Sequence, residues 1–99
     1  MIETYKRLAT SYAQSRNYDC ALENYFQALK IQSLGGDDKG TAQTLERVGD
    51  VYKNLVNKKK ANEFYLKAIR IYELLDAQES AELSKLKLKH LYVTQIIPR

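Results

Sequence analysis

Two stretches of the chain share one spacing of small and aromatic side chains: Ala21–Ala28 reads ALENYFQA, and Ala61–Ala68 reads ANEFYLKA. In each stretch an alanine is followed four residues later by a tyrosine and three residues after that by a second alanine. A spacing of four and three keeps side chains on one face of an α-helix. The stretches begin forty residues apart, and this period predicts a repeated structural unit.

The period extends well beyond these stretches. When residues 1–34 are aligned with residues 41–74, identical residues occur at Thr4/Thr44, Arg7/Arg47, Tyr12/Tyr52, Asn17/Asn57, Ala21/Ala61, Glu23/Glu63, Tyr25/Tyr65, Ala28/Ala68, Ile31/Ile71 and Leu34/Leu74. About two identities would be expected by chance in a comparison of this length. A fixed period of this size predicts units that stack side by side and share one continuous core.

The composition is that of a small soluble domain. The 99 residues are 44% hydrophobic and 28% charged, with one proline and four glycines, a mixture that suits long helices. No apolar run approaches the roughly 18 residues that span a bilayer, and the first residues do not resemble a signal peptide. The lack of such a run predicts no membrane partner, and a single cysteine, Cys20, which cannot form an internal disulfide, predicts a reducing, cytoplasmic setting. The net charge of +4 lies mainly in residues 80–99.

Apolar periodicity predicts five helices and no strands. They cover about residues 2–15, 18–33, 41–56, 59–75 and 80–96, and residues 34–40 form the clearest loop. Thr41 or the residue before it is expected to cap the third helix. The residues predicted to pack inward include Leu8 in the first helix, Leu55 and Val56 in the third, and Leu75 in the fourth. In the fifth helix they are Leu83, Leu86, Leu91, Val93 and Ile97.

This pattern resembles the tetratricopeptide repeat, whose units place a large residue, Leu, Gly or Ala, and Tyr on a first helix, and Ala, an aromatic and Ala on a second. The first unit matches with Tyr5, Leu8, Ala9, Tyr12, Ala21, Tyr25 and Ala28, and the second with Leu45, Val48, Gly49, Tyr52, Ala61, Tyr65 and Ala68. The family's usual period is about 34 residues. The longer period here resembles the repeats of kinesin light chains and of spindle-orientation adaptors.

The resemblance implies a single all-α domain over residues 1–99. One repeat would cover about 2–34, a second about 41–75, and a C-terminal helix about 80–97 would cover the open end of the stack. Leu88 and Tyr92 lie forty residues after Val48 and Tyr52 and so fall on first-helix positions of a third unit. Lys89 stands where the second repeat has the small residue Gly49. The side chains of Lys85, Lys87 and Lys89 are expected on the outer face of this helix.

No residue pattern indicates catalysis or a cofactor. The only histidine, His90, has no carboxylate three or four residues away, and Cys20 has no histidine in its repeat. Asp37 and Asp38 lack the carboxylate spacing of a calcium loop and are interpreted as turn residues. We therefore expect a non-enzymatic protein without a metal or a cofactor.

The family's geometry implies a function in protein–protein interaction, because the first helices of its repeats line a concave groove for a partner's peptide or helix. By repeat position, that groove would be lined by Glu3, Lys6, Thr10, Ala13, Gln14, Gln43, Glu46, Arg47, Asp50, Lys53 and Asn54. Lys6 with Arg47, and Glu46 with Asp50, predict a partner that carries both charge signs. One subclass binds the C-terminal carboxylate of chaperones through Lys and Asn; Lys6 fits it, but Thr10 and Arg47 replace the asparagines.

The sequence also allows self-association and contact with acidic partners. Two and a half repeats are fewer than a stable stack normally needs, which predicts self-association into a homodimer through exposed end residues such as Ile2 and Tyr5. The chain would then be a structural or oligomerising fragment of a longer array. The run Lys58–Lys60 is interpreted as a solvated turn, or as a contact for an acidic partner. Nucleic acid is disfavoured, because no stacking aromatics accompany the lysines near the C-terminus.

Overall fold

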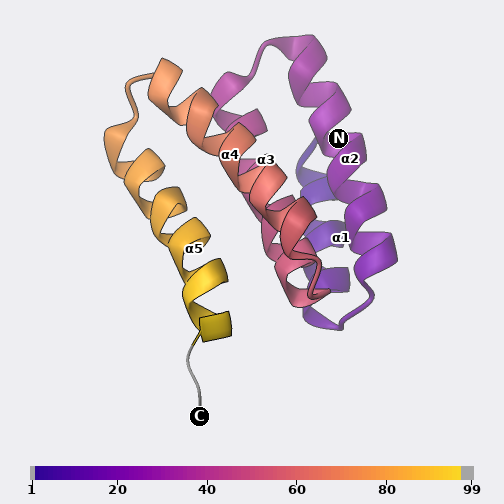
Figure 1. Ribbon diagram of the computed structural model, residues 1–99. Helices are drawn as coiled ribbons and strands as arrows, with labels where there is room; N and C mark the ends of the chain where they lie inside the picture. Colours follow the sequence, from indigo (N-terminus) through magenta and orange to yellow (C-terminus); the bar gives the residue numbers. More distant parts are fainter. Residues whose placement is uncertain (1, 97–99) are drawn as a thin grey trace.

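Five α-helices, each antiparallel to the next, form a single layered stack (Figure 1). The computed structural model describes the backbone of residues 2–96 and the side chains of residues 2–91. The helices are α1 (Ile2–Gln14), α2 (Tyr18–Gly35), α3 (Asp38–Asn54), α4 (Lys58–Leu74) and α5 (Gln78–Ile96). Each helix packs against the next one in the chain, so the all-α helical-hairpin prediction is confirmed. The side chains of Tyr92, Val93 and Ile97 lie outside the described residues.

The turns α1–α2, α3–α4 and α4–α5 share one backbone geometry. Each contains a residue in the left-handed region: Arg16 with φ 66°, Val56 with φ 60° and Asp76 with φ 59°. The next residue's N–H then reaches back to a carbonyl in the last turn of the preceding helix, as in Asn57 N–H to Tyr52 O at 2.9 Å. This closure reverses the chain within three residues and makes each helix antiparallel to its neighbour.

The predicted loop at 34–40 is wrong in its extent. Helix α2 continues to Gly35 and ends at Gly36 with φ 74°, and α3 already begins at Asp38. Asp37, rather than Thr41 or Gly40, caps α3, because its Oδ1 accepts the Gly40 N–H at 3.0 Å. An acidic cap also suits the positive end of the helix dipole, so the polar run starts a helix instead of extending a loop.

The repeated small residues lie where helices approach most closely. The alanines at positions 9, 21, 28, 61 and 68 are all completely buried. Gly49 has the same role in the second repeat, because a Cβ there would come within 2.7 Å of the Tyr65 ring. The Ala–Tyr–Ala spacing therefore encodes packing between helices: small residues leave the room that the buried tyrosines fill.

Several predicted inward residues are exposed instead. In α5, Leu83 and Leu86 are 57% and 49% exposed, and the helix packs through Ala81, Ser84 and Leu91. This helix carries two apolar stripes, and periodicity alone could not decide which of them faces the stack. Leu8 in α1 is also partly exposed, as are three residues near the ends of α3 and α4, where the chain turns away from the core: Leu55, Val56 and Leu75.

Candidate protein-binding groove

Three adjoining hollows lie along α1 and α3 and together form the candidate groove. The first, of about 450 Å³, lies over α1 and is lined by Glu3, Lys6, Arg7, Thr10, Ser11 and Arg47. The second, of about 350 Å³, is lined by Gln43, Glu46, Arg47, Asp50, Tyr72 and Lys87. The third, of about 310 Å³, joins the two helices and is lined by Thr10, Ala13, Gln14, Tyr25, Arg47, Asp50, Val51 and Asn54.

Arg47 lies at the centre of this groove, since its side chain lines all three hollows. The structure brings together every residue that the sequence assigned to the groove except Lys53. Lys53 is exposed near the end of α3 and lines none of the three hollows. The assignment of these residues as a partner-binding groove stays a prediction.

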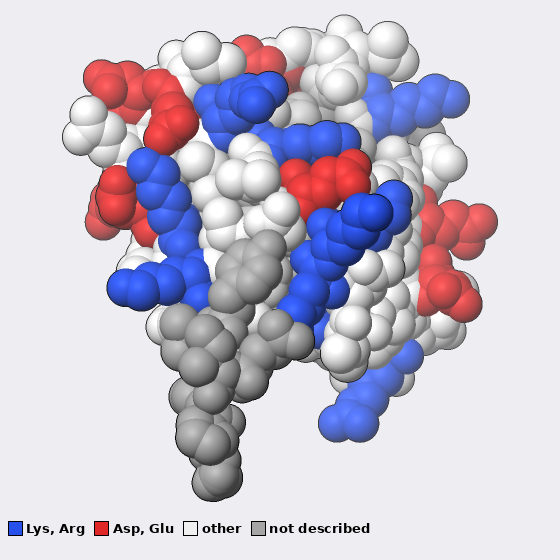
Figure 2. All heavy atoms as spheres, in the orientation of Figure 1, with Lys and Arg blue, Asp and Glu red and all other residues white. Residues whose placement is uncertain are grey.

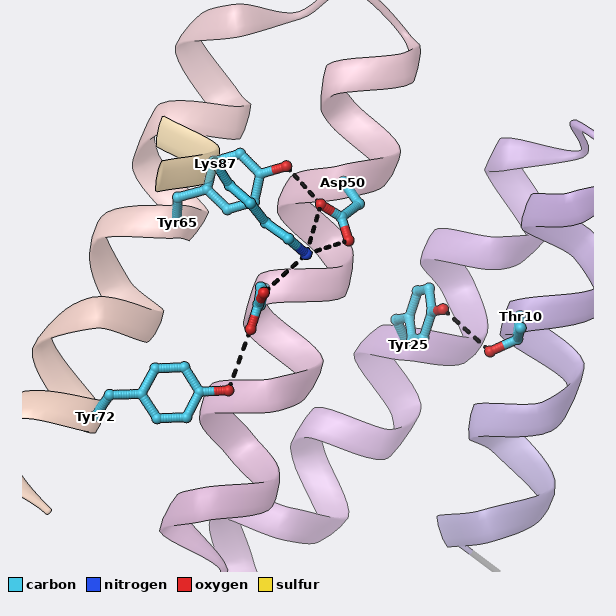
Figure 3. A network of polar contacts seen from close by, with 7 residues as sticks. Thr10, Tyr25, Asp50, Tyr65, Tyr72 and Lys87 are labelled. Carbon is cyan, nitrogen blue, oxygen red and sulfur yellow. Dashed lines mark hydrogen bonds and ion pairs between the residues drawn. The ribbon is translucent and has the colours of Figure 1, made fainter. Parts of the chain in front are cut away.

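A lysine from α5 occupies the acidic part of the groove. Lys87 Nζ lies 2.8 Å from Glu46 Oε2 and 3.1 Å from Asp50 Oδ2. Figure 3 shows its side chain reaching across to the carboxylate of Asp50. The expectation that Lys87 lies on the outer face of α5 is thus wrong: the residue faces α3, and it joins the terminal helix to the groove wall.

Two tyrosines of α4 hold the same carboxylates from the other side. Tyr65 Oη donates a hydrogen bond to Asp50 Oδ1, and Tyr72 Oη donates one to Glu46 Oε1 at 3.2 Å (Figure 3). Burial, and then the neighbouring Glu46 carboxylate, raises the pKa of Tyr72 to about 12, and burial with the Asp50 hydrogen bond raises the pKa of Tyr65 further. Both phenols therefore stay protonated donors at neutral pH.

The ion pairs also act on the lysine. Burial alone would lower the pKa of Lys87, but its hydrogen bonds and charge interactions with Glu46 and Asp50 outweigh burial and raise it. The cluster of Glu46, Asp50, Tyr65, Tyr72 and Lys87 is hereafter called the acid–lysine cluster. Its two acids lie on α3 and its lysine lies on α5, so the cluster exists only when α5 is packed in place.

The first repeat has a neutral counterpart of this cluster. Thr10 Oγ1 and Tyr25 Oη lie 3.3 Å apart, at positions forty residues before Asp50 and Tyr65 (Figure 3). Threonine therefore stands at the repeat position that aspartate occupies in the second unit. The packing tyrosine is the same in both repeats. Its partner on the groove wall is neutral in the first repeat and negatively charged in the second.

Positive charge in the groove is left available to a partner. Arg47 is exposed, and no carboxylate in the described part of the chain forms an ion pair with it. Lys6 has only a long contact of 4.0 Å with the exposed Glu3. Lys87 pairs with both Glu46 and Asp50 but offsets only one of their two negative charges, so a partner that carries both charge signs stays a prediction.

One signal in the sequence could have located Lys87. It lies forty residues after Arg47, which lies forty after Arg7, so a cation recurs at the same helical position in α1, α3 and α5. Sequence reasoning treated the lysines of α5 as one polar face and missed this relationship. Of the other two lysines, Lys85 pairs with Glu73 of α4 at 2.9 Å, and Lys89 is exposed.

The remaining surface shows no concentrated site. On the face in Figure 2, basic and acidic side chains are interspersed rather than gathered into a patch of one sign. Among the described residues, no three His, Cys, Asp or Glu side chains gather closely enough to hold a metal ion. Within residues 2–96, none of the helices combines the length and hydropathy that a bilayer-spanning segment requires.

Comparison with known proteins agrees with the architecture described above. The family model described as the tetratricopeptide repeat matches residues 1–73, which include α1 to α3 and nearly all of α4. No curated protein and no solved structure matches the chain. The matched region contains both repeats but ends before α5, the helix that supplies Lys87.

Proposed function

Because this chain belongs to the tetratricopeptide repeat family, whose repeats generally mediate protein–protein interaction, we propose that it binds a segment of another protein in the groove along α1 and α3. The hollows over these helices share Arg47, carry several charged and polar side chains, and extend over both repeats. A bound peptide or helix would run across them and contact the variable residues between the packing positions. The chain would act as a non-catalytic adaptor without a cofactor.

The observation that carries this proposal is the position of Arg47. Its guanidinium is exposed at the junction of the three hollows and has no ion-pair partner among the described residues. Lys6 supplies a second cation on the neighbouring helix. Guanidinium groups bind carboxylates with two parallel hydrogen bonds, so a partner that presents an acidic side chain at this junction fits best.

The groove differs from that of the chaperone-binding subclass of the family. A chaperone C-terminal carboxylate would find Lys6, but it would meet Thr10 and Arg47 where that subclass of the family has asparagines. We therefore favour an internal acidic segment over a chain end. The period of forty residues supports a grouping with the kinesin-light-chain variety, and the single Cys20 supports a cytoplasmic setting.

The test compares binding by groove and control variants. Reversing the acids Glu46 and Asp50 is unsuitable, because it would also remove the partners of Lys87 and release α5. Instead, Lys6→Glu with Arg47→Glu should abolish capture of the partner in a pull-down while circular dichroism stays unchanged. Arg70→Glu, at an exposed position on α4 outside the groove, is the control and should retain capture. Equal capture by all variants would refute the groove proposal.

A further inference from the structure

Helix α5 carries two exposed leucines that no helix of the described chain covers. Leu83 and Leu86 lie about one helical turn apart and are 57% and 49% exposed, while Ala81, Ser84 and Leu91 pack toward the stack. Helix α5 forms one edge of the molecule (Figure 1). In the sequence, Leu83, Leu86, His90, Val93 and Ile97 alternate at spacings of three and four, the pattern of a helix that pairs with another helix.

A second helix of the repeat type does not fit against α5. In the α3–α4 hairpin, Gly49 allows the two helices to approach closely, because even a Cβ there would come within 2.7 Å of the Tyr65 ring. The corresponding residue of α5, forty positions later, is Lys89. A long charged side chain at this point keeps a hairpin helix away, so the occupant must approach the leucines from a different direction.

We propose that α5 pairs in antiparallel fashion with α5 of a second copy of this chain. When Leu83 of one copy lies opposite Leu86 of the other, the two-fold axis makes the contact reciprocal, so all four leucines become covered. The flanking positions of this alignment place Glu82 of each copy opposite Lys89 of the other. The exposed surface is therefore complementary to itself in charge.

The charges also select the alignment. Sliding one helix by seven residues would place Lys89 opposite Lys89 of the second copy, and this like-charge contact disfavours the shifted arrangement. The apolar strip is small by the standard of stable interfaces, so we expect dissociation constants of about 0.1 to 1 mM. This dimer specifies which end helix mediates self-association, and it does not depend on the groove or on its ligand.

The experiment measures self-association by sedimentation equilibrium up to about 1 mM protein. Wild type should form dimers, and Leu83→Gln with Leu86→Gln should be monomeric with unchanged helicity. Glu82→Lys alone and Lys89→Glu alone should each weaken the dimer by about tenfold, because each creates two like-charge contacts across the axis. The double variant Glu82→Lys with Lys89→Glu restores opposite charges and the original net charge, so it should recover wild-type affinity.

Two controls keep the outcomes distinct. Arg70→Glu changes the net charge as Lys89→Glu does, but it lies on α4 and should leave dimerisation unchanged. The groove variant Lys6→Glu with Arg47→Glu should also dimerise normally, so failure of one proposal does not imply failure of the other. A monomeric wild type, or a double charge-swap variant as weak as the single ones, would overturn the antiparallel dimer.

Discussion

Lys87 Nζ lies 2.8 Å from Glu46 Oε2, and this ion pair joins α5 to α3 across the wall of the groove. The lysine also pairs with Asp50, so one cation contacts two half-buried acids and offsets one of their two negative charges. The terminal helix is thereby fixed by a polar contact as well as by its packing on α4. The same contact reduces the acidic charge that a partner would otherwise meet in the groove.

The first prediction concerns this ion pair. Lys87→Met keeps the aliphatic stem but leaves Glu46 and Asp50 without a counter-charge, so the free energy of unfolding should fall by about 1 to 2 kcal/mol. Urea denaturation measures the loss, and hydrogen exchange should show faster opening of α5. Lys89→Met is the matched control and should stay within about 0.5 kcal/mol of wild type. Equal effects of the two substitutions would contradict a special role for Lys87.

The second prediction concerns the close approach of α3 and α4. Gly49→Ala places a Cβ 2.7 Å from the Tyr65 ring, which must shift and weaken its bond to Asp50. We expect a net loss of about 1 to 2 kcal/mol in thermal or urea unfolding, even though alanine favours helices. Gly35→Ala is the control: no atom lies within 4 Å of its added Cβ, so this variant should be neutral or more stable.

The third prediction concerns Val56, a β-branched residue with φ 60° that is 79% exposed. The left-handed conformation strains such a side chain, and little burial compensates for it. Val56→Gly should therefore raise the free energy of unfolding by about 0.5 to 1 kcal/mol, measured by urea denaturation. Leu55→Gly, at the neighbouring residue with φ −81°, should destabilise the protein instead. A loss of stability in the Val56 variant would show that strain is absent.

The fourth prediction compares two buried hydroxyls at the same repeat position. Thr44 Oγ1 donates to Gln32 Oε1 at 2.9 Å, whereas Ser84 Oγ is buried with no hydrogen-bond partner among the described residues. Thr44→Val should cost about 1 to 3 kcal/mol, because the glutamine oxygen loses its donor. Ser84→Ala should instead stabilise the protein by up to about 1 kcal/mol. Chemical denaturation of both variants measures whether their free energies of unfolding change in opposite directions.

The fifth prediction is a loss of stability at alkaline pH. The pKa of Tyr72 is about 12 in the folded chain against 10.0 ordinarily, so the unfolded chain releases this proton first and unfolding becomes easier as pH rises from about 10 to 12. Tyr65 and Lys87 act in the same direction, because the pKa of each is also raised in the folded chain. The ion-pair contribution of Lys87 is complete below 10.5 and is lost above it. Below these values none of the three groups makes stability depend on pH.

Urea denaturation of wild type and Tyr72→Phe at about pH 9 and pH 11.5 isolates the contribution of Tyr72. Tyr72→Phe removes the tyrosine term, so its stability should fall less between these pH values than that of wild type, by on the order of 1 to 2 kcal/mol. Tyr18→Phe, at a half-buried tyrosine on α2 outside the acid–lysine cluster, is the control. Identical pH profiles for wild type and Tyr72→Phe would exclude the tyrosine contribution.

The repeat itself could be predicted from the sequence, because packing between helices requires small and aromatic residues at fixed intervals. The positions of Ala21, Tyr25 and Ala28, and their copies forty residues later, determine which faces meet. The same interval predicted a set of groove residues, and all of them except Lys53 line the three hollows. Helix ends were less predictable, because Asp37 and the later Thr41 are both acceptable caps and only the closing backbone geometry selects one.

The tertiary structure decided what α5 does. Its sequence has two apolar stripes and three lysines, so the apolar pattern alone does not select one orientation of the helix. Contact with α3 and α4 selected Ala81, Ser84 and Leu91 for the core, turned Lys87 toward Glu46, and left Leu83 and Leu86 exposed. Sequence periodicity describes one helix at a time, whereas the pairing of a lysine with acids some forty residues away depends on how helices are placed against one another.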